Sequence, residues 1–406
     1  MAIYKVGVIG GGTMGAGIAQ VISTNGTPVV LKEVNDEMLQ RGLANIRKVY
    51  EGRVAKKRMT PEEMQEKLKL VVPTTSYEPF KEVDLVIEAV PEILKLKLEI
   101  FRELDRICTA GAILATNTSA LSISALGSAT RRPDKVVGMH FFYPAHIMKL
   151  VEVIPGLATS DETVEEVITF AEGLRKLPVK VRECPGFLVN RLLMPYLNEA
   201  VLALQEGAAS IPEMDQAMKE QGWPMGPFTL IDALGLDVCA EAGKVLWEGY
   251  GDRMHPAELW MRMQELKRLG RKNGKGFYDY TGVGPTDPGR ADPELEKEIA
   301  ALRQRLGPST SSGRTAFSPE RLMVLLINEA VLALQENISS ANEIEIAVMA
   351  GLGYPPSKGG LLHAADAIGI DALVDHLDRF TKELGFRFHP AHRLRTMRHA
   401  GMRFFN

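Results

Sequence analysis

The chain has 406 residues, 45% hydrophobic and 24% charged, which is the composition of a soluble globular protein with room for about two or three domains. Its formal net charge of -3 gives no support for nucleic-acid or membrane-surface binding, and its apolar runs are too short and too interrupted to cross a bilayer. Cys108, Cys184 and Cys239 lack CxxC spacing, and the N-terminus has no signal-peptide pattern, so we expect buried, reduced thiols in a cytoplasmic protein.

A glycine-rich loop lies between a predicted strand at residues 3–9 and a predicted helix at residues 16–24. The loop Gly10-Gly11-Gly12-Thr13-Met14-Gly15 has the GxGxxG spacing. Gly10 would allow a tight turn, Gly12 would let a pyrophosphate approach the backbone, and Gly15 would allow close helix packing. This context favours a dinucleotide-binding loop over an ordinary strand–helix turn, with the helix N-terminus facing the phosphates.

An acidic residue, Glu33, follows the second predicted strand, residues 28–31. Its distance from the glycine loop is about that expected of a carboxylate that binds ribose hydroxyls. Such a carboxylate would repel a 2′-phosphate, so the sequence favours NAD over NADP. A solvated strand end is the alternative interpretation, and the neighbouring Lys32 leaves the strictness for NAD open.

Residues 36–70 are predicted to form two helices. The first is expected to end near Glu51-Gly52, and the second to begin at the capping pattern Thr60-Pro61-Glu62-Glu63. Between them lies a basic cluster, RVAKKR, at residues 53–58. Such a junction is either a solvated surface or a docking site for a phosphorylated part of a ligand.

Two further predicted strands, residues 84–90 and 112–116, end near polar groups. Pro91-Glu92 is expected to open a helix after the first, and Asn117-Thr118-Ser119 follows the second. Because ligands of doubly wound sheets bind beyond the carboxyl ends of the strands, Asn117, Thr118 and Ser119 are candidates for substrate contacts. Helix capping is the alternative role for the Ser and Thr side chains.

The segment GMHFFYPAHIMKLVEVI, residues 138–154, contains His140 in one predicted strand and Glu152 in the next. If the two strands pair across the loop that contains Pro144, these side chains can meet. A histidine that moves protons at neutral pH needs an acceptor on its second ring nitrogen, which Glu152 could provide. A core histidine and a solvent-facing glutamate are the alternative.

Beyond the last predicted strand, residues 179–182, Cys184-Pro185-Gly186 breaks the alternation of strands and helices. A long amphipathic helix is predicted at residues 187–205, and its segment NEAVLALQE, residues 198–206, recurs identically at residues 328–336. A second pair of segments is also similar: residues 222–237, GWPMGPF…DALGLD, resemble residues 353–371, GYPPSKGG…DAIGID. We therefore predict an α/β Rossmann-type dinucleotide-binding domain with a mostly parallel sheet, followed by two related all-α domains.

The predicted boundaries are 1–184 for the NAD-binding domain, 185–281 for the first helical domain and 315–406 for the second. Residues 282–314 are predicted to form a linker with a helix at 294–306, because Pro, Gly, Asp and Ser are frequent in the segments that flank that helix. Asn190 in the first copy corresponds to Glu320 in the second, which suggests that only the first copy contributes chemistry.

The chain resembles the 3-hydroxyacyl-CoA dehydrogenases of fatty-acid β-oxidation. The motifs that carry the resemblance span residues 3–280 and are VGVIGGGTMGAGIA, DLVIEAVPE, ATNTSALSI, GMHFFYPAHIMKLVEVI, PGFLVNRLL and GRKNGKGFYDY. The tail from about residue 315 resembles the second helical domain of multifunctional β-oxidation enzymes and of two-repeat 3-hydroxybutyryl-CoA dehydrogenases.

This resemblance implies NAD-dependent oxidation of an (S)-3-hydroxyacyl-CoA, such as 3-hydroxybutyryl-CoA, to a 3-ketoacyl-CoA. His140 would be the general base, Glu152 would orient it, and Ser119 and Asn190 would hydrogen-bond the reacting oxygen or the imidazole. The implied cofactor contacts are Gly10, Gly12, Thr13, Met14, Gly15, Glu33, Glu92, Lys97 and Lys272. Lys56 and Lys57 would meet the CoA phosphates, and Tyr143 stands where the family usually has Asn, which leaves that contact open.

Other functions remain possible at this point. A related dehydrogenase could act on a 3-hydroxyadipyl-CoA-like thioester or on a gulonate-like hydroxy acid, and a non-catalytic NAD-binding protein is a further alternative. We expect no metal, because the sequence has no HExxH or clustered Cys/His pattern and His389, His392 and His399 lie among arginines. The expected assembly is a homodimer, or a monomer whose second repeat takes the place of a partner.

Overall fold

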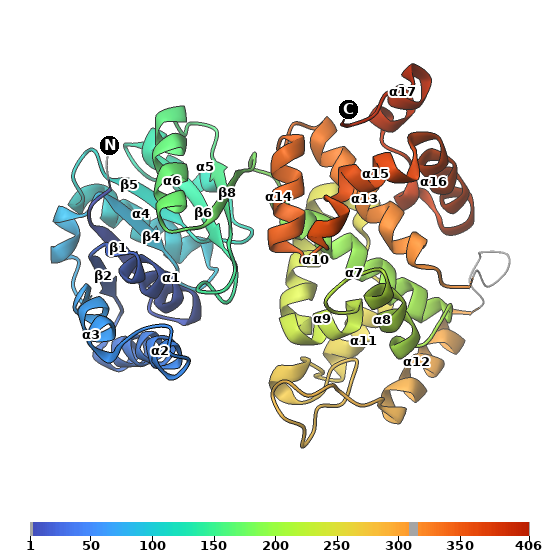
Figure 1. Ribbon diagram of the computed structural model, residues 1–406, viewed down its shortest axis with the longest axis horizontal. Helices are drawn as coiled ribbons and strands as arrows, with labels where there is room; N and C mark the ends of the chain where they lie inside the picture. Colours follow the sequence, from blue (N-terminus) through green and yellow to red (C-terminus); the bar gives the residue numbers. More distant parts are fainter. Residues whose placement is uncertain (1–2, 308–315, 406) are drawn as a thin grey trace. The chain divides into compact units, whose positions relative to one another are not determined.

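The structure is a computed structural model that describes residues 3–307 and 316–405. The chain divides into two compact units, Met1–Phe187 and Leu188–Asn406 (Figure 1). The predicted linker residues 308–314 lie outside the described residues. Within the described ranges, no helix is long and apolar enough to cross a membrane.

The first unit is built on an eight-stranded sheet with the order β3-β2-β1-β4-β5-β6-β7-β8. The strands are β1 Val6–Ile9, β2 Val29–Lys32, β3 Val71–Thr74, β4 Leu85–Glu88, β5 Ile113–Thr116, β6 Val136–Phe141, β7 Leu150–Pro155 and β8 Leu177–Lys180. All neighbours are parallel except β6 and β7, which confirms the predicted mostly parallel sheet. Because β2 and β4 flank β1, the chain reverses its direction of winding there, and ligands of doubly wound sheets bind beyond the carboxyl ends of strands at such a point.

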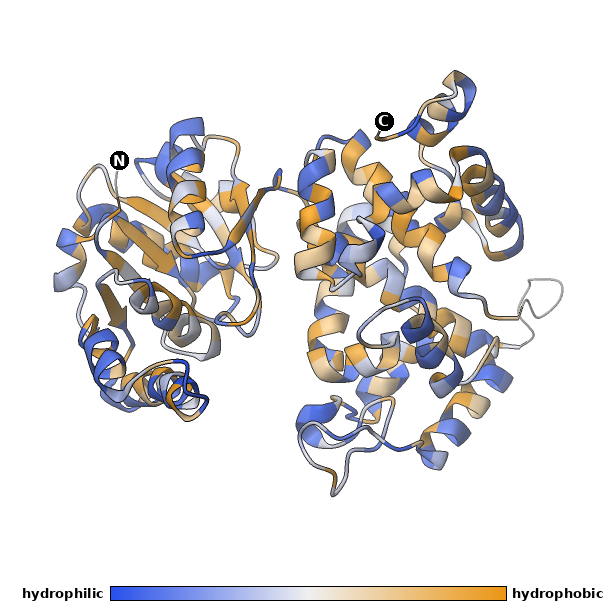
Figure 2. Ribbon diagram, viewed as in Figure 1, coloured by the Kyte–Doolittle hydropathy of each residue, from blue (hydrophilic) through white to orange (hydrophobic). Residues whose placement is uncertain are grey.

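The central strands are apolar because helices cover both faces of a doubly wound sheet. Every residue of β1, β2, β4 and β5 is buried, and Figure 2 shows the strands in the hydrophobic colour. The edge strand β3 was not predicted. Its Val72 is 44% exposed and it contains Pro73, so it lacks the apolar run of a buried strand.

Six α-helices accompany the sheet: α1 Thr13–Thr24, α2 Asp36–Ala55, α3 Pro61–Lys69, α4 Leu94–Ile107, α5 Ile123–Ser128 and α6 Asp161–Gly173. The predicted capping box is present, since Thr60 accepts from the Glu63 N–H and Glu63 accepts from the Thr60 N–H. Several predicted limits were wrong. Helix α2 continues through Gly52 to Ala55, helix α4 begins at Leu94 and not at Pro91, and β8 lies two residues earlier than predicted.

The second unit contains two five-helix repeats. The first consists of α7 Val189–Glu206, α8 Ile211–Glu220, α9 Pro227–Leu234, α10 Leu236–Tyr250 and α11 Glu258–Glu265. The second consists of α13 Pro319–Gln335, α14 Ala341–Gly351, α15 Leu361–Ile368, α16 Ile370–Leu384 and α17 His392–Ala400. Helix α12, Pro293–Leu306, joins them and corresponds to the helix expected within the linker. The structure therefore confirms the predicted duplication.

The duplicated helices α7 and α13 pack against each other through reciprocal ion pairs. Arg191 of α7 lies 2.7 Å from Glu329 of α13, and the equivalent Arg321 of α13 lies 2.7 Å from Glu199 of α7. Both arginine side chains are at most 2% exposed. The two copies of the identical segment thus form one buried, nearly symmetric interface within the unit.

Candidate active site

His140 and Glu152 occupy directly paired positions on the antiparallel strands β6 and β7. Nδ1 of His140 lies 2.7 Å from Oε2 of Glu152. His140 is 8% exposed and Glu152 is fully buried. Donation from Nδ1–H to the carboxylate fixes the tautomer, so the lone pair lies on Nε2, the nitrogen that can take a proton.

Aromatic and polar neighbours hold the histidine in place. The ring centroids of Phe142 and Phe187 lie 4.5 Å and 5.9 Å from that of His140. Asn117, which follows β5, accepts a hydrogen bond of 2.8 Å from the N–H of Phe141. The polar residue after one strand therefore fixes the backbone beside the histidine on the next strand, which is a role distinct from the substrate contact or cap that the sequence suggested.

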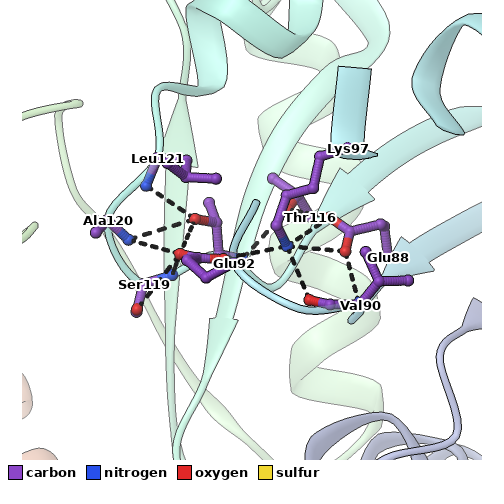
Figure 3. Close-up of polar contacts among 9 residues, drawn as sticks. Glu88, Val90, Glu92, Lys97, Thr116, Ser119, Ala120 and Leu121 are labelled. Atoms are coloured by element: carbon purple, nitrogen blue, oxygen red, sulfur yellow. Dashed lines mark hydrogen bonds and ion pairs between the residues drawn. The ribbon is translucent and has the colours of Figure 1, made fainter. Parts of the chain in front are cut away.

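Glu92 organises the loop that follows β5 (Figure 3). Its Oε1 accepts from the N–H groups of Ser119, at 2.9 Å, and Ala120, at 3.2 Å, and from the hydroxyl of Thr118. Burial alone would raise the pKa of Glu92, but the charge of Lys97 and these hydrogen bonds lower that pKa below its ordinary value. The ionised carboxylate thus fixes the backbone from which the Ser119 hydroxyl projects.

A buried ion pair lies beside this loop. Nζ of Lys97 is 2.8 Å and 3.0 Å from the two carboxylate oxygens of Glu88, and 3.2 Å from Oε2 of Glu92. The Thr116 hydroxyl and the Val90 N–H also donate to Glu88, each at 2.7 Å (Figure 3). Glu88 was not predicted as a site residue, although an acid near the end of the apolar run DLVIEAV was a usable signal. Lys97, predicted to approach a cofactor, is held between two carboxylates at the end of β4.

The glycine loop after β1 has the geometry that a dinucleotide requires. Gly10 has φ +94°, which favours glycine, and a Cβ on Gly15 would lie 1.7 Å from the Gly10 carbonyl oxygen. A Cβ on Gly12, by contrast, would meet no described atom within 4 Å, so space is available there for a ligand. Gly12 is the N-cap of α1 and provides no side-chain cap, so the first turn, with Thr13 and Met14, presents its N–H groups to that space.

Glu33 lies against this loop, since its Oε1 accepts a 2.6 Å hydrogen bond from the Gly11 N–H. The neighbouring Lys32 does not neutralise the site through an ion pair, because its ammonium lies over the ring of Tyr77, 4.3 Å from the centroid. Burial lowers the pKa of Lys32 by more than the nearby charge of Glu33 raises it, so the pKa lies below its ordinary value. An acid beside the glycine loop fits ribose hydroxyls and disfavours a 2′-phosphate.

A basic groove of about 720 Å³ lies between α1, α2 and the loop that joins β6 to β7. Its basic lining residues are Lys48, Arg53, Lys56, Arg58 and His146, and no lining residue among the described ones is acidic. Nε of Arg53 is buried and has no hydrogen-bond partner within the described chain. Burial lowers the pKa of His146, and the cations of Lys176, Arg53 and Lys56 lower it further. The groove therefore fits a multiply charged anion.

Lys56 and Lys57, which were both predicted to meet the CoA phosphates, differ in their relation to the basic groove. Both lysines are exposed, but only Lys56 lines the basic groove, whereas Lys57, with φ 55°, does not. Tyr143 also lines the groove and is 67% exposed. Arg53 and Arg58 belong to the predicted basic cluster, whereas Lys48 was not predicted, because only the helix geometry shows that it shares a face with them.

Two predicted site residues belong to the second unit. Asn190 lies half-buried in the first turn of α7, and Lys272 forms an ion pair with Asp237. Their roles stay predictions. The structure thus places His140 against Glu152 and Glu33 against the glycine loop. It also places Ser119 against Glu92, which forms an ion pair with Lys97.

The histidines and cysteines outside this site show no metal-binding arrangement. Residues 3–307 and 316–405 contain no group of three or more His, Cys, Asp or Glu side chains that could hold a metal ion. His389, His392 and His399 are exposed, as predicted. Cys108 and Cys239 are buried, whereas the prediction was wrong for Cys184, which is half-buried beside the start of the second unit.

Comparison with known proteins gives matches over nearly the whole chain. The family model "3-hydroxyacyl-CoA dehydrogenase, NAD binding domain" matches residues 5–184, and "3-hydroxyacyl-CoA dehydrogenase, C-terminal domain" matches residues 186–280 and 317–403. The fatty acid oxidation complex subunit alpha of Pseudomonas putida KT2440 is 39% identical over 410 residues, covering all of this chain and 56% of the relative. The chain therefore spans about half the length of the curated relatives it matches.

Solved structures of 3-hydroxybutyryl-CoA dehydrogenases also match most of the chain. The 3-hydroxybutyryl-CoA dehydrogenase of Escherichia coli K12 is 30% identical with a TM-score of 0.86, covering 98% of each chain. The (S)-3-hydroxybutyryl-CoA dehydrogenase of Ralstonia eutropha is 40% identical with a TM-score of 0.67, covering 69% of this chain and 99% of the other. The first match therefore extends through both helical repeats, and the second covers about two thirds of the chain.

Proposed function

This chain belongs to the 3-hydroxyacyl-CoA dehydrogenase family of NAD-dependent oxidoreductases, and from that premise we propose that it oxidises an (S)-3-hydroxyacyl-CoA to the 3-ketoacyl-CoA. We take 3-hydroxybutyryl-CoA as the first substrate to test, because similar solved structures carry that name. The observation that carries the proposal is the buried His140–Glu152 pair in a unit that also has an NAD-type glycine loop.

The residues of the first unit fit the dinucleotide. The N–H groups at the start of α1 would hold its pyrophosphate, and Glu33 would hold the adenosine ribose. When bound, NAD supplies the acceptor for the hydride that leaves the carbinol carbon. Lys97 and Glu92, at the carboxyl end of β4, would contact the nicotinamide half.

His140 is the proposed general base. Nε2 would take the proton of the substrate hydroxyl as the carbonyl forms, and would return it in the reverse direction. Glu152 would orient the ring through Nδ1 and stabilise the imidazolium. Its full burial strengthens this stabilisation, because few water dipoles compete with the carboxylate.

Ser119 and Asn190 are proposed to hydrogen-bond the reacting oxygen or the imidazole. The Ser119 backbone is held by Glu92, so its hydroxyl would be presented from a fixed position. Asn190, at the start of α7, would be contributed by the second unit. Glu320 takes the equivalent position in the second repeat and pairs there with His376 and Arg379, which supports an architectural role for that copy.

The basic groove favours a CoA thioester over a gulonate-like acid. A groove with several cations and no acid suits the phosphates of CoA, whereas a small hydroxy acid has a single carboxylate. A 3-hydroxyadipyl-CoA-like thioester carries the same CoA group, so the groove does not discriminate it from 3-hydroxybutyryl-CoA. The Glu33 carboxylate beside the glycine loop supports NAD as the preferred cofactor.

Oxidation of NADH by acetoacetyl-CoA, followed with the full chain, tests the proposal directly. We expect saturable turnover that depends on both substrates and that is slower with NADPH. Acetoacetate without CoA should be a far poorer substrate if the groove binds the CoA group. Absence of NADH oxidation at high protein concentration, with NADH binding intact, would rule out the proposed activity.

A further inference from the structure

A cavity of about 480 Å³ lies in the helical unit between α7, α10 and α11 of the first repeat, and Leu325 and Arg387 of the second repeat also line it. Most of its walls are apolar, and they include Ala240, Gly243, Trp247, Met254, Trp260 and Met261. None of the predicted catalytic or cofactor-binding residues lines it. A volume of this size is typical of small-molecule sites, which are commonly about 300–1,000 Å³ and mostly apolar.

The second repeat shows what the same helix arrangement looks like when part of this space is filled, since its equivalent cavity measures only about 230 Å³. Helices α10 and α16 align without a gap, since DALGLD and DAIGID precede the same positions in both and HPA follows in both. Gly243 corresponds to Leu377, and Ala240 corresponds to Val374. Leu377 and Val374 are fully buried, whereas a Cβ built on Gly243 meets no described atom within 4 Å. The first repeat therefore has space where the second has hydrocarbon.

The residues at the mouth of the cavity also differ between the repeats, and again the first repeat is the more open one. Met261 corresponds to Arg395, and Lys244 corresponds to Asp378. In the second repeat Arg395 lies 2.6 Å from Asp378, and this ion pair connects α17 to α16. In the first repeat no such pair can form between Met261 and Lys244, and Met261 is 59% exposed. At the equivalent place the second repeat has a cavity of only about 230 Å³, which Arg395 lines, so the cavity of the first copy is about twice as large.

We propose that this cavity binds the hydrocarbon chain of a fatty acid or of an acyl thioester. The aliphatic side chains of Val374 and Leu377 show which chemistry fills such a space in this fold. Met194, Met254 and Met261 line the walls, and thioether side chains adapt to flexible alkyl chains. The choice of an acyl chain over another hydrocarbon rests on the proposed function, because that activity would bring acyl groups to the protein.

Charges of both signs surround the mouth, so they do not select one head group. The basic lining residues are Lys244, Arg253 and Arg387, and the acidic ones are Glu199, Asp237 and Glu241. A free fatty acid and its CoA thioester carry the same hydrocarbon chain, which is the part that the apolar walls would bind. Decanoic acid and decanoyl-CoA are the probes that separate these two sources.

Tryptophan fluorescence of the full chain reports occupancy, because two of its three tryptophans, Trp247 and Trp260, line the cavity. We expect a saturable change in emission with decanoic acid, decanoyl-CoA or both, and none with acetate. The double variant Ala240→Val, Gly243→Leu introduces the residues of the second repeat and should weaken binding about tenfold or more, since it removes the apolar contact surface. Its turnover of 3-hydroxybutyryl-CoA should remain that of the original chain.

A second variant, Met261→Arg, keeps the test decisive if the double variant fails to fold. Met261 is largely exposed, so the arginine can be accommodated, and it should weaken binding by placing a charge at the mouth. Absence of a saturable change with both probes, or unchanged affinity in the folded variants, would overturn the proposal. Binding is measured without turnover, so failure of the proposed dehydrogenase activity would be recognised separately.

Discussion

The ammonium group of Lys97 lies 2.8 Å from Oε1 of Glu88, in an interior where neither side chain is more than 1% exposed. A pair so completely removed from water depends on both partners, because Glu88 alone would be an uncompensated buried charge and Lys97 alone would keep only the more distant Glu92, at 3.2 Å. This pair lies at the carboxyl end of β4, beside the loop that presents Ser119. Its geometry therefore connects the stability of the first unit to the candidate site.

Replacement of Glu88 by Gln should destabilise the first unit by about 3–5 kcal/mol, because it leaves the Lys97 charge without its closest partner. Urea unfolding, followed by circular dichroism, measures this loss. Lys95→Met is the matched control, since Lys95 lies exposed on the same helix and should change stability by less than about 0.5 kcal/mol. Equal effects of the two substitutions would show that the buried pair is unimportant.

The lowered pKa of Glu92 predicts a stability contribution that depends on pH. Because the folded-state pKa lies below that of the unfolded chain, this contribution is fully present above the ordinary glutamate pKa and is lost as the pH falls through the folded-state value. Glu92→Gln should therefore be destabilised at neutral pH, and its stability should fall less steeply on acidification. Urea midpoints measured between neutral and acid pH test this, and parallel pH profiles would contradict it.

The basic groove predicts different effects for two adjacent lysines. Lys56→Gln should raise the KM for acetoacetyl-CoA several-fold with little change in kcat, because a contact made equally in ground and transition states affects binding alone. Lys57→Gln should have almost no effect, since Lys57 does not line the groove. The effect of Lys56→Gln should shrink at high salt. Equal KM values for the two variants would exclude the groove as the CoA site.

The buried interface between α7 and α13 predicts that the chain is a monomer. Arg191 and Arg321 already pair with acids of the opposite repeat, so the face of α7 that carries the duplicated segment is covered within one chain. Light scattering on the full chain should give the mass of one copy across a wide concentration range. A stable dimer would show that another surface mediates assembly.

Much of this arrangement could be predicted from the sequence because it depends on local pattern. The alternation of side chains along two short strands indicated that His140 and Glu152 could meet if the strands pair, and the GxGxxG spacing was enough to locate the loop after β1. The identical NEAVLALQE segments likewise identified the duplication. Each of these features is visible within a short window of residues.

The features that were missed depend on contacts between distant segments or on exact helix ends. Glu88 and Lys97 lie on different elements, so nothing in either segment alone indicates their pairing. Lys56 and Lys57 are adjacent in sequence, yet the end of α2 at Ala55 and the positive φ of Lys57 direct only one of them to the groove. The strand β3 was missed because a half-exposed edge strand with a proline resembles a loop.

The proton-transfer role of His140 is the central claim, and His140→Ala tests it most directly. A steady-state assay with acetoacetyl-CoA and NADH, combined with a separate measurement of NADH binding, separates chemistry from cofactor affinity. We predict that kcat falls by about 10²–10⁴-fold, the usual contribution of a general acid–base residue, while NADH affinity is retained. Unchanged kcat in a folded, NADH-binding variant would contradict the account.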